Sequence, residues 1–497
     1  MNTKSFYIVF ASALLILCSI CFNGSYAYFL ATVDTSGNVA SSLTTDELND
    51  IVLTGTEIKS SSNLIPGESV STTFTVENSN KVDVCFDLEW SQVVNTFVNK
   101  DDLVVTLEDS TGKVLVSGLT FPTNDTSLIT GLKVKAKTIN TYTLKVLYKN
   151  TNKSQNDDMN KSFKGTISGV LKECQATMAD YITTLAKTDT TNLVTDDYGN
   201  TRYVGSDPDN YISVDGEVWR VIGVMKDIDD GTGNKEDRVK IVRNESIGSY
   251  AWDTSDSSVN DGYGVNEWNQ ADVMKLLNPG YESESVGGSL YWNSGSGNCY
   301  KNSGNGTTSC DFTSTGIKNS LKNLIDSVKW NLGTNDGKTY VYNNILTSKF
   351  YEFERGTNNG KICTSGTYCT DTITRATTWM GNIGLIYPSD YGYATSGGTT
   401  TNRATCLNTV LYKWDDSSLS DCKNNDWLYN GTDQWTMLPY ANSAYNNRLF
   451  IIRSAGFMGH FNACDGDGGV RPAAYLQSSV SIVSGTGSKT NPFILSA

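Results

Sequence analysis

The residues best suited to nucleophilic chemistry lie close together near the end of the chain. His460 is the only histidine among 497 residues, so a Ser–His–Asp or Cys–His system would have to use it as its base. Cys464 follows on the same segment and could serve as the nucleophile. The run of small and polar residues at 460–469 is more typical of a surface loop than of an active site. We therefore predict no catalytic residues.

Paired carboxylates could catalyse glycoside hydrolysis if they faced each other across a cleft. Such pairs occur at Asp415/Asp416, Asp465/Asp467 and Glu352/Glu354. Because the chain holds 53 Asp and Glu residues, these pairs arise by chance and do not predict a glycosidase. Asp465 and Asp467 could also hold a cation, but a flexible turn is the simpler interpretation.

No metal or cofactor site is predicted. The acidic loop 227–237 has Gly231 where an EF-hand needs a ligand, so we expect the solvated tip of a hairpin. No cysteine pair has the CxxC spacing of a zinc site. No phosphate-binding loop or dinucleotide fingerprint occurs.

Ligand binding accounts better for the aromatic, amide-rich stretch 427–476. Tyrosine supplies rigid contact area, and small polar residues adapt their hydrogen bonds, as in antibody paratopes. The predicted ligand-binding residues are Tyr440, Tyr445, Asn446, Asn447, Phe450, His460, Phe461, Asn462, Asp465 and Asp467. Segments 449–453 and 470–476 are expected to form the frame, closing the sheet against the strands near Trp219. The alternative is an ordinary surface hairpin in an Asn-rich protein.

The overall composition favours an exposed, β-rich protein. The chain is 38% hydrophobic and 19% charged, with a net charge of −14. A polar chain with few charges suits β-structure and irregular loops. No run of Lys and Arg is present to neutralise phosphates, so nucleic acid is not expected as a partner. The length allows two or three domains.

The N-terminal residues predict export. Lys4 precedes an apolar run, 6–22, and the small residues Ser25 and Ala27 suit signal-peptidase cleavage after Ala27. The alternative is an uncleaved anchor, because the run is barely long enough to span a bilayer. We expect a signal peptide at 1–27 and a secreted, extracellular or cell-surface protein.

The cysteines are expected to form disulfides in an exported chain. Eleven are present, and Cys18 and Cys21 precede the cleavage site. The predicted local pairs are Cys299–Cys310, Cys363–Cys369 and Cys406–Cys422, each closing one loop. Cys85 and Cys174 could join the first domain to its exit segment, which leaves Cys464 without a partner.

Residues 28–172 are predicted to form a β-sandwich. Apolar and polar residues alternate at 82–90, 103–107 and 142–148, the pattern of half-buried strands, with turns between them. The segments 64–70 and 74–78 resemble those of camelysin-like proteins of biofilm-matrix fibres. This resemblance implies that the domain takes part in assembly. Some members of that family are metallopeptidases, but this domain contains no histidine and no HExxH motif to carry that activity over.

The following residues mix helices and strands. A helical connector is predicted at 173–205, from Met178, Tyr181, Ile182 and Leu185 at helical spacing. Segments 218–225 and 238–243 predict a strand hairpin. Two helices are expected next. Asn266 would cap the first, which ends at 278–279, and the second would carry an apolar stripe over 317–328 and end near Gly333. Irregular loops are expected at 356–447.

This order of elements, closed by a hairpin and a terminal strand, resembles the C-type-lectin fold. The resemblance rests on segment 219–223 in the N-terminal part of the domain and segment 469–473 in its C-terminal part, with segments 387–391 and 425–427 between them. Segment 469–473 is similar to the closing element of formylglycine-generating-enzyme-like domains and of the ligand-displaying domains of diversity-generating retroelement proteins. Residues 206–497 are therefore expected to form an α+β C-type-lectin-like domain.

The chain departs from the calcium-dependent and catalytic members of these families. It lacks a Glu-Pro-Asn-type motif, and 425–427 has the order Asn-Asp-Trp instead of Trp-Asn-Asp. The oxidases use neighbouring cysteines, whereas Cys464 stands alone late in the chain. Resemblance to retroelement proteins implies variable positions derived from Asn codons. Residues 460–468 are all reachable from such codons, as most residue types are, and Cys464 would be a product of this variation.

The sequence thus predicts a multidomain, β-rich bacterial surface or matrix protein. Its N-terminal β-sandwich would attach or self-assemble. Its C-terminal domain would bind a protein or glycan on a host, phage or neighbouring cell, without a cofactor. The alternatives are a structural subunit of an extracellular fibre and, less well supported, an enzyme on the same fold.

Overall fold

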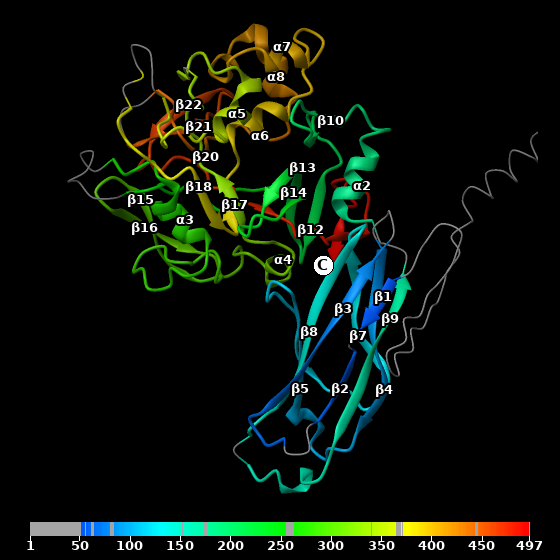
Figure 1. Cartoon of the computed structure of the whole chain (residues 1–497). Coiled ribbons are helices and arrows are strands. Elements are labelled where there is room, and N and C mark those ends of the chain that lie inside the picture. The colour runs from blue at the N-terminus through cyan, green and yellow to red at the C-terminus, as the bar shows by residue number, and fades with distance from the viewer. Residues whose placement is uncertain are drawn as a thin grey trace, which may run out of the picture. The chain divides into compact units, whose positions relative to one another are not determined.

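The computed structural model describes residues 51–54, 56–60, 64–79, 84–151, 153–172, 176–254, 263–338, 340–363, 369, 371–442 and 446–496. The predicted signal peptide, 1–27, lies outside the described residues. The chain divides into two compact units, Met1–Gln175 and Ala176–Ala497, and both are rich in strands (Figure 1). None of the helices in the described ranges is long and apolar enough to cross a membrane.

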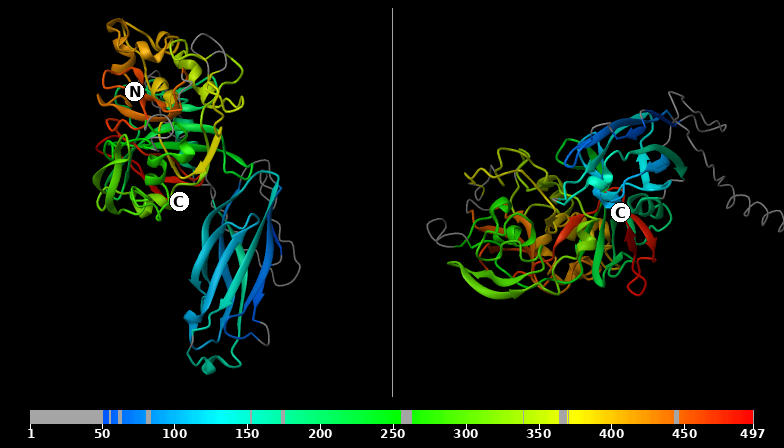
Figure 2. Two further views of the ribbon diagram at one scale, coloured as in Figure 1. Left: turned by 90° about the vertical axis from the view of Figure 1, so that its left-hand side faces the viewer. Right: turned by 90° about the horizontal axis from the view of Figure 1, so that it is seen from below.

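The described part of the first unit consists of two antiparallel sheets. One has the strand order β1-β3-β8-β5-β6 and the other β2-β9-β4-β7, and the long strands run along the unit (Figure 2). The strands are β1 (Ile51–Thr54), β2 (Glu57–Lys59), β3 (Ser69–Asn78), β4 (Val84–Asn95), β5 (Leu103–Asp109), β6 (Val114–Thr120), β7 (Thr126–Val134), β8 (Thr138–Tyr148) and β9 (Phe163–Lys172). Single 3-10 turns are η1 (Lys100–Asp102) and η2 (Asn156–Asp158).

The two sheets of this unit share one apolar core. Leu144 on β8 belongs to the first sheet and Leu88 on β4 to the second, and both are fully buried in the same cluster. The ring of Trp90 packs edge-on against Phe121, with centroids 4.9 Å apart. The predicted strands around Leu88, Val105 and Leu144 are confirmed, because period-two alternation buries one face of each.

A seven-stranded sheet forms the centre of the second unit. Its order is β10-β11-β13-β14-β23-β19, and β12 also pairs with β13. These strands are β10 (Leu193–Thr195), β11 (Thr201–Tyr203), β12 (Tyr211–Val214), β13 (Glu217–Asp229), β14 (Lys235–Arg243), β19 (Ile383–Gly384) and β23 (Ala473–Tyr475). The predicted hairpin is confirmed as β13–β14, and Asp229 pairs with Lys235 at its tip. Gly223 lets β11 approach, since a Cβ there would lie 2.2 Å from the Thr201 carbonyl oxygen.

Smaller elements surround this sheet. The helices are α2 (Met178–Leu185), α3 (Asp272–Leu277), α4 (Asn319–Lys322), α5 (Phe350–Glu354), α6 (Pro388–Tyr393), α7 (Arg403–Leu407) and α8 (Ser420–Asn424), with 3-10 turns η4 (Trp268–Gln270), η5 (Thr347–Lys349), η6 (Leu411–Lys413) and η7 (Ser417–Leu419). The other strand pairs are β15 (Ser296–Asn302) with β16 (Gly306–Asp311), β17 (Val328–Asn331) with β18 (Thr378–Gly381), and β24 (Ser481–Ser484) with β25 (Ile494–Ser496). A three-stranded sheet contains β20 (Gln434–Pro439), β21 (Arg448–Ile452) and β22 (Met458–Asn462).

The connector helix belongs to the second unit. Thr177 and Asp180 form a capping box at the start of α2, and Met178 and Ile182 are fully buried in the core of this unit. The Met178 amide also donates to the carbonyl of Val480, 2.7 Å away. The connector helix therefore packs on the core of the second unit and is held by a contact with the C-terminal residues.

The two helices predicted after the hairpin were wrong in extent. Asn266 does not cap a helix, because its side chain donates to the Arg448 carbonyl and accepts from Arg375. Trp268 lies in the turn η4 and only 272–277 is α-helical. The stripe at 317–328 is buried as predicted, but the helix α4 covers only 319–322. The chain then becomes β17, because a distant strand, β18, offers it backbone partners.

Segments 449–453 and 470–476 were both predicted to close the sheet against the strands near Trp219, and this was half wrong. Segment 470–476 does enter the central sheet, where Ala473 on β23 pairs with Val242 on β14. Segment 449–453 does not. It lies in β21, whose partners β20 and β22 form the separate three-stranded sheet.

Candidate ligand-binding site

The three-stranded sheet brings together three of the predicted binding residues, Tyr440, Phe450 and His460. His460 on β22 is directly opposite Phe450 on β21. The Tyr440 amide, just after β20, donates to the carbonyl of Arg448, 2.9 Å away. Alternation along these strands places Tyr440, Phe450 and His460 on one face of the sheet.

An aromatic cluster covers this face. It consists of Tyr342, Tyr412, Tyr440, Phe450 and His460. The rings of Tyr440 and His460 are closest, with centroids 4.2 Å apart. Tyr342 lies 5.0 Å from Tyr440 and 5.2 Å from Tyr412 between ring centroids. Tyr342, Tyr412 and His460 are half-buried, so part of the cluster is accessible at the surface.

Two members of the cluster were missed by the sequence reasoning. Tyr342 comes from the loop before η5, and its hydroxyl donates to the carbonyl of Met458 on β22. Tyr412 comes from the turn η6. Neither has a local pattern that distinguishes it from the other 24 tyrosines of the 26 in the chain. Only the tertiary fold brings these loops to the sheet.

Three predicted contact residues are buried. Tyr440, Phe450 and Asn447 are 4%, 0% and 7% exposed, so they support the surface from beneath and do not offer contact area of their own. Asn446 is half-buried, and its carbonyl accepts from the Asn266 amide. Tyr445 lies outside the described residues.

The remaining predicted residues leave the aromatic face. Phe461 points to the other side of the sheet, where the Arg453 guanidinium lies 4.0 Å from its ring centroid. The Asn462 amide donates to the Asp465 carboxylate, 3.0 Å away, and this bond closes the turn. Asp467 is exposed and apart from the cluster.

The turn at 463–468 is tightly packed, which contradicts the expectation of a flexible turn. A Cβ at Gly466 would lie 2.1 Å from the Lys301 carbonyl oxygen. A Cβ at Gly468 would lie 2.3 Å from the ring of Trp435. Small residues occur here because neighbouring chain segments leave no room for a side chain, and random variation at these two positions would be excluded by packing.

His460 and Cys464 do not have the electrostatics of a catalytic pair. Burial, reinforced by Arg448 and Arg453, lowers the pKa of His460 to about 4. Burial and the neighbouring Asp465 raise the pKa of Cys464 to about 11. A cysteine nucleophile needs the opposite shifts, since the thiolate must be stabilised by a nearby cation. The Cys464 thiol instead contacts Asp465, with 3.9 Å between Sγ and Oδ1.

A cavity of about 430 Å³ lies elsewhere, beside the β12–β13 turn. Its lining residues are Asp215, Gly216, Glu217, Val218, Arg243, Asn244, Glu245, Ser314 and Lys318, none of them aromatic. Arg243 Nε lies 2.6 Å from Glu217 Oε1, and Trp219 donates to the other oxygen of this carboxylate. The most buried charges of the cavity are thus already paired, and it offers less to a ligand than the aromatic cluster.

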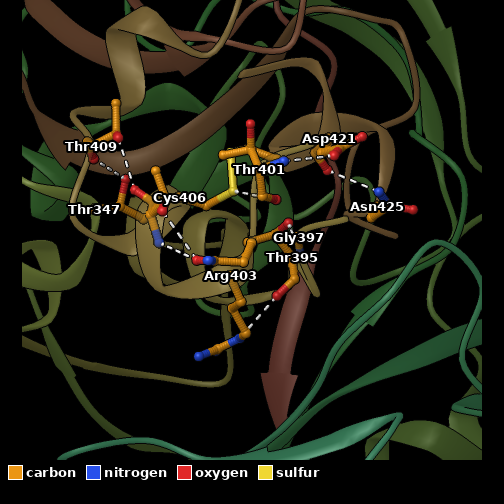
Figure 3. Close-up of a disulfide and its surroundings, with 12 residues drawn as sticks. Thr347, Thr395, Gly397, Thr401, Arg403, Cys406, Thr409, Asp421 and Asn425 are labelled. Carbon is orange, nitrogen blue, oxygen red and sulfur yellow. Dashed lines mark hydrogen bonds between the residues drawn. A yellow bond between two sulfur atoms is a disulfide. The ribbon is translucent and has the colours of Figure 1, made fainter. Parts of the chain in front are cut away.

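Three predicted disulfides are present: Cys299–Cys310, Cys363–Cys369 and Cys406–Cys422. The last one closes the loop that contains η6, and Arg403 near its start donates to the Thr395 carbonyl (Figure 3). Cys85 is disulfide-bonded, and its predicted partner Cys174 lies outside the described residues. These bonds are compatible with an extracellular protein.

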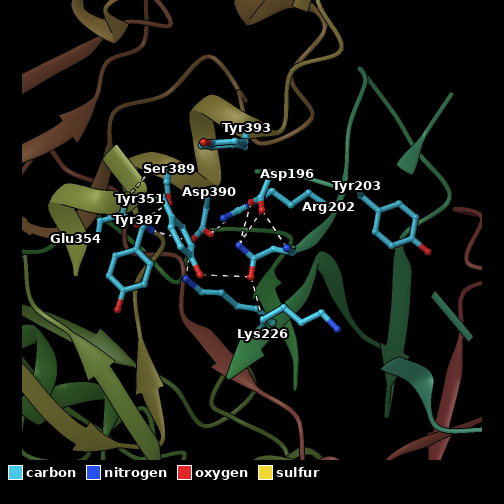
Figure 4. A network of polar contacts seen from close by, with 12 residues as sticks. Asp196, Arg202, Tyr203, Lys226, Tyr351, Glu354, Tyr387, Ser389, Asp390 and Tyr393 are labelled. Atoms are coloured by element: carbon cyan, nitrogen blue, oxygen red, sulfur yellow. Dashed lines mark hydrogen bonds and ion pairs between the residues drawn. The ribbon is translucent and has the colours of Figure 1, made fainter. Parts of the chain in front are cut away.

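A network of buried charges lies beneath α6. Arg202 on β11 bridges two carboxylates, with Nε 2.7 Å from Asp196 and Nη1 3.3 Å from Asp390. Lys240 on β14 reaches the other oxygen of Asp390, at 2.5 Å. Figure 4 shows Asp196, Arg202 and Asp390 converging, with Glu354 and Ser389 beside them. Breaking one partner of such a network would leave an uncompensated charge in the core.

Comparison with known proteins identifies no family. No protein-family model matches the chain, and no curated protein matches it. Among solved structures, one described as "AvmM Catalyzes Macrocyclization in Alchivemycin A Biosynthesis" matches at 10% sequence identity. The match covers 23% of this chain and 74% of that chain, with a TM-score of 0.16, which is too low to support an argument about fold or function.

Proposed function

We propose that the chain is an exported binding protein with a β-sandwich first unit and a C-type-lectin-like second unit. For the first unit, the proposal is supported by two antiparallel sheets around one core. For the second, it is supported by the β13–β14 hairpin, by the irregular disulfide-closed loops and by β23, which returns from near the C-terminus to pair with β14.

The second unit binds a protein or glycan through the aromatic cluster. The observation that carries this proposal is the packing of half-buried Tyr342 and His460 on buried Tyr440. Half-buried Tyr412 extends this surface by packing on Tyr342. Tyrosines already fixed by neighbours lose little rotamer freedom when a partner covers them. The polar rim is supplied by exposed Asn343, Asn344, Lys413 and Asp415.

Binding also fits the charge states at this surface better than catalysis does. His460 is neutral at physiological pH, since its pKa is lowered to about 4, and can offer one ring nitrogen as donor and the other as acceptor. Arg448, which helps to lower that pKa, precedes Phe450 by two residues on β21, so alternation places it on the same side of the sheet, where it can attract an acidic ligand group.

An array of immobilised glycans and extracellular host and bacterial surface proteins tests this proposal. We expect the full chain to be retained by one ligand class. Tyr412→Ala with His460→Ala should abolish retention, whereas Tyr181→Ala, which removes a 38% exposed tyrosine from α2, should not. Equal retention of the double variant, or no retention of the full chain by any spot, would refute the proposal.

We also propose self-association of the first unit through β6. This strand is at the edge of its sheet and pairs with β5 alone among the described strands. It exposes Val114 and Leu119 by 49% and 46%. An exposed apolar edge strand is a template for pairing with a second copy. Light scattering should show concentration-dependent oligomers that Leu119→Lys reduces, and a monomer at all concentrations would exclude this assembly.

A further inference from the structure

An amine and a carboxylate are held against each other in the core of the second unit. Lys240 Nζ lies 2.5 Å from Asp390 Oδ2, and their side chains are only 1% and 2% exposed. Lys240 projects from the central strand β14, and Asp390 from the third position of α6. The Tyr387 amide donates to the same carboxylate oxygen at 2.8 Å, which fixes its direction.

Aromatic rings surround the amine. Nζ of Lys240 lies 3.9 Å from the ring centroid of Tyr387, 5.3 Å from that of Trp330 and 5.6 Å from that of Tyr475. All three rings are buried. Burial lowers the pKa of Lys240, although Asp390 and Glu354 offset part of this effect. Loss of hydration favours the neutral form of a lysine amine, which is the nucleophilic form.

A cation and a second carboxyl group complete the arrangement. Arg202 Nη1 lies 3.3 Å from Asp390 Oδ1, the oxygen that does not contact Lys240. Glu354 on α5 is fully buried and accepts from the amide and hydroxyl of Ser389, the neighbour of Asp390 (Figure 4). Burial, with the nearby charge of Asp390, raises the pKa of Glu354 to about 7, so this group exchanges protons near neutral pH.

We propose that Lys240 and Asp390 become joined by a covalent amide bond inside the folded second unit. The pair starts as ammonium and carboxylate, because Lys240 and Arg202 together outweigh burial and lower the pKa of Asp390. Proton transfer from Nζ to Oδ2 gives the neutral amine and acid. Nζ then attacks Cγ, and Arg202 stabilises the negative charge that develops on Oδ1.

The step balances without an added reagent. The Nζ–Cγ bond forms and the Cγ–Oδ2 bond breaks. The ammonium group gives up two of its three protons, and both leave with Oδ2 as one water molecule. Glu354 is suited to carry the second proton, and the aromatic walls exclude the bulk water that would favour hydrolysis.

The bond would tie the central sheet to α6 across a sequence separation of 150 residues. The three described disulfides span only 6 to 16 residues each, so they fix loops but do not join distant elements. An amide is also insensitive to reducing agents. This inference is independent of the proposed ligand, since it concerns residues of β14 and α6 that do not belong to the aromatic cluster.

Mass spectrometry of the full chain, unfolded and fully reduced, tests the inference. We expect a mass lower than that of the sequence by one water molecule, and a branched proteolytic peptide that contains both Lys240 and Asp390. Lys240→Arg keeps the charge but should restore the full mass. Separate linear peptides with unmodified Lys240 and Asp390 in the natural chain would overturn the proposal, whatever the stability of the variant.

Discussion

The disulfide between Cys406 and Cys422 gives the sharpest stability prediction. It joins residues 16 apart, and both cysteines are fully buried. In the chain-entropy model, closing a loop of this length removes about 3 kcal/mol of unfolded-state entropy. Replacing both residues by alanine also leaves small cavities that cost about 1 kcal/mol. We therefore expect the double variant to lose about 4 kcal/mol of unfolding free energy.

Urea unfolding followed by tryptophan fluorescence measures this loss. Nine of the ten tryptophans lie in the second unit, so the signal reports mainly on that unit. One of them, Trp414, lies inside the closed loop and packs on Tyr391 with ring centroids 5.4 Å apart. Its emission should shift at lower urea in the double variant.

Cys464→Ala is the matched control, because it removes a buried thiol that forms no disulfide. The control should lose about 1 kcal/mol, from packing alone. If the double variant lost no more than this control, the loop would already be ordered by its other contacts. The cross-link would then contribute nothing, and the reasoning from loop length would be refuted.

Three further changes test other parts of the structure. The Glu354 carboxyl has a folded pKa of about 7 against an ordinary value of 4.5, so the stability that it contributes is present below pH 4.5 and is lost as pH rises through 7. In chemical unfolding, the difference in unfolding free energy between Glu354→Gln and the natural chain should therefore be more favourable to the variant by about 3 kcal/mol at pH 8 than at pH 4.5. Parallel pH profiles of the two proteins would contradict this. Thr177→Ala removes the side chain that caps α2 together with Asp180, and should cost the second unit about 1 kcal/mol in the same assay; no loss would show that the cap is dispensable. Gly466→Ala would place a Cβ 2.1 Å from the Lys301 carbonyl oxygen and should lower thermal stability by about 2 kcal/mol, whereas an unchanged melting temperature would mean that the turn can move aside.

The sequence predicted the features that depend on neighbouring residues. The strands around Leu88, Val105 and Leu144 were identified because alternation is visible within a few residues. The local disulfides were identified because their cysteines are close in sequence. The hairpin of β13 and β14 was identified because a polar turn separates two apolar runs.

Features that depend on distant partners were not predictable in this way. The apolar stripe over 317–328 suggested one helix, but pairing with β18 converts its end into a strand. Tyr342 and Tyr412 join His460 only through tertiary packing of separate loops. The contact of Lys240 with Asp390 likewise has no signal in the neighbouring sequence, because Lys240 lies on a central strand and Asp390 on a short helix much later in the chain.

The central claim is that the aromatic cluster is the binding surface. The most direct measurement is the dissociation constant of the full chain for the ligand retained on the array, compared with that of Tyr412→Ala combined with His460→Ala. Truncating two aromatic contacts costs about 2–4 kcal/mol of binding energy, so we predict affinity weakened by at least about 30-fold in a variant that remains folded at the temperature of the assay. An affinity within about twofold of the natural chain would contradict the account.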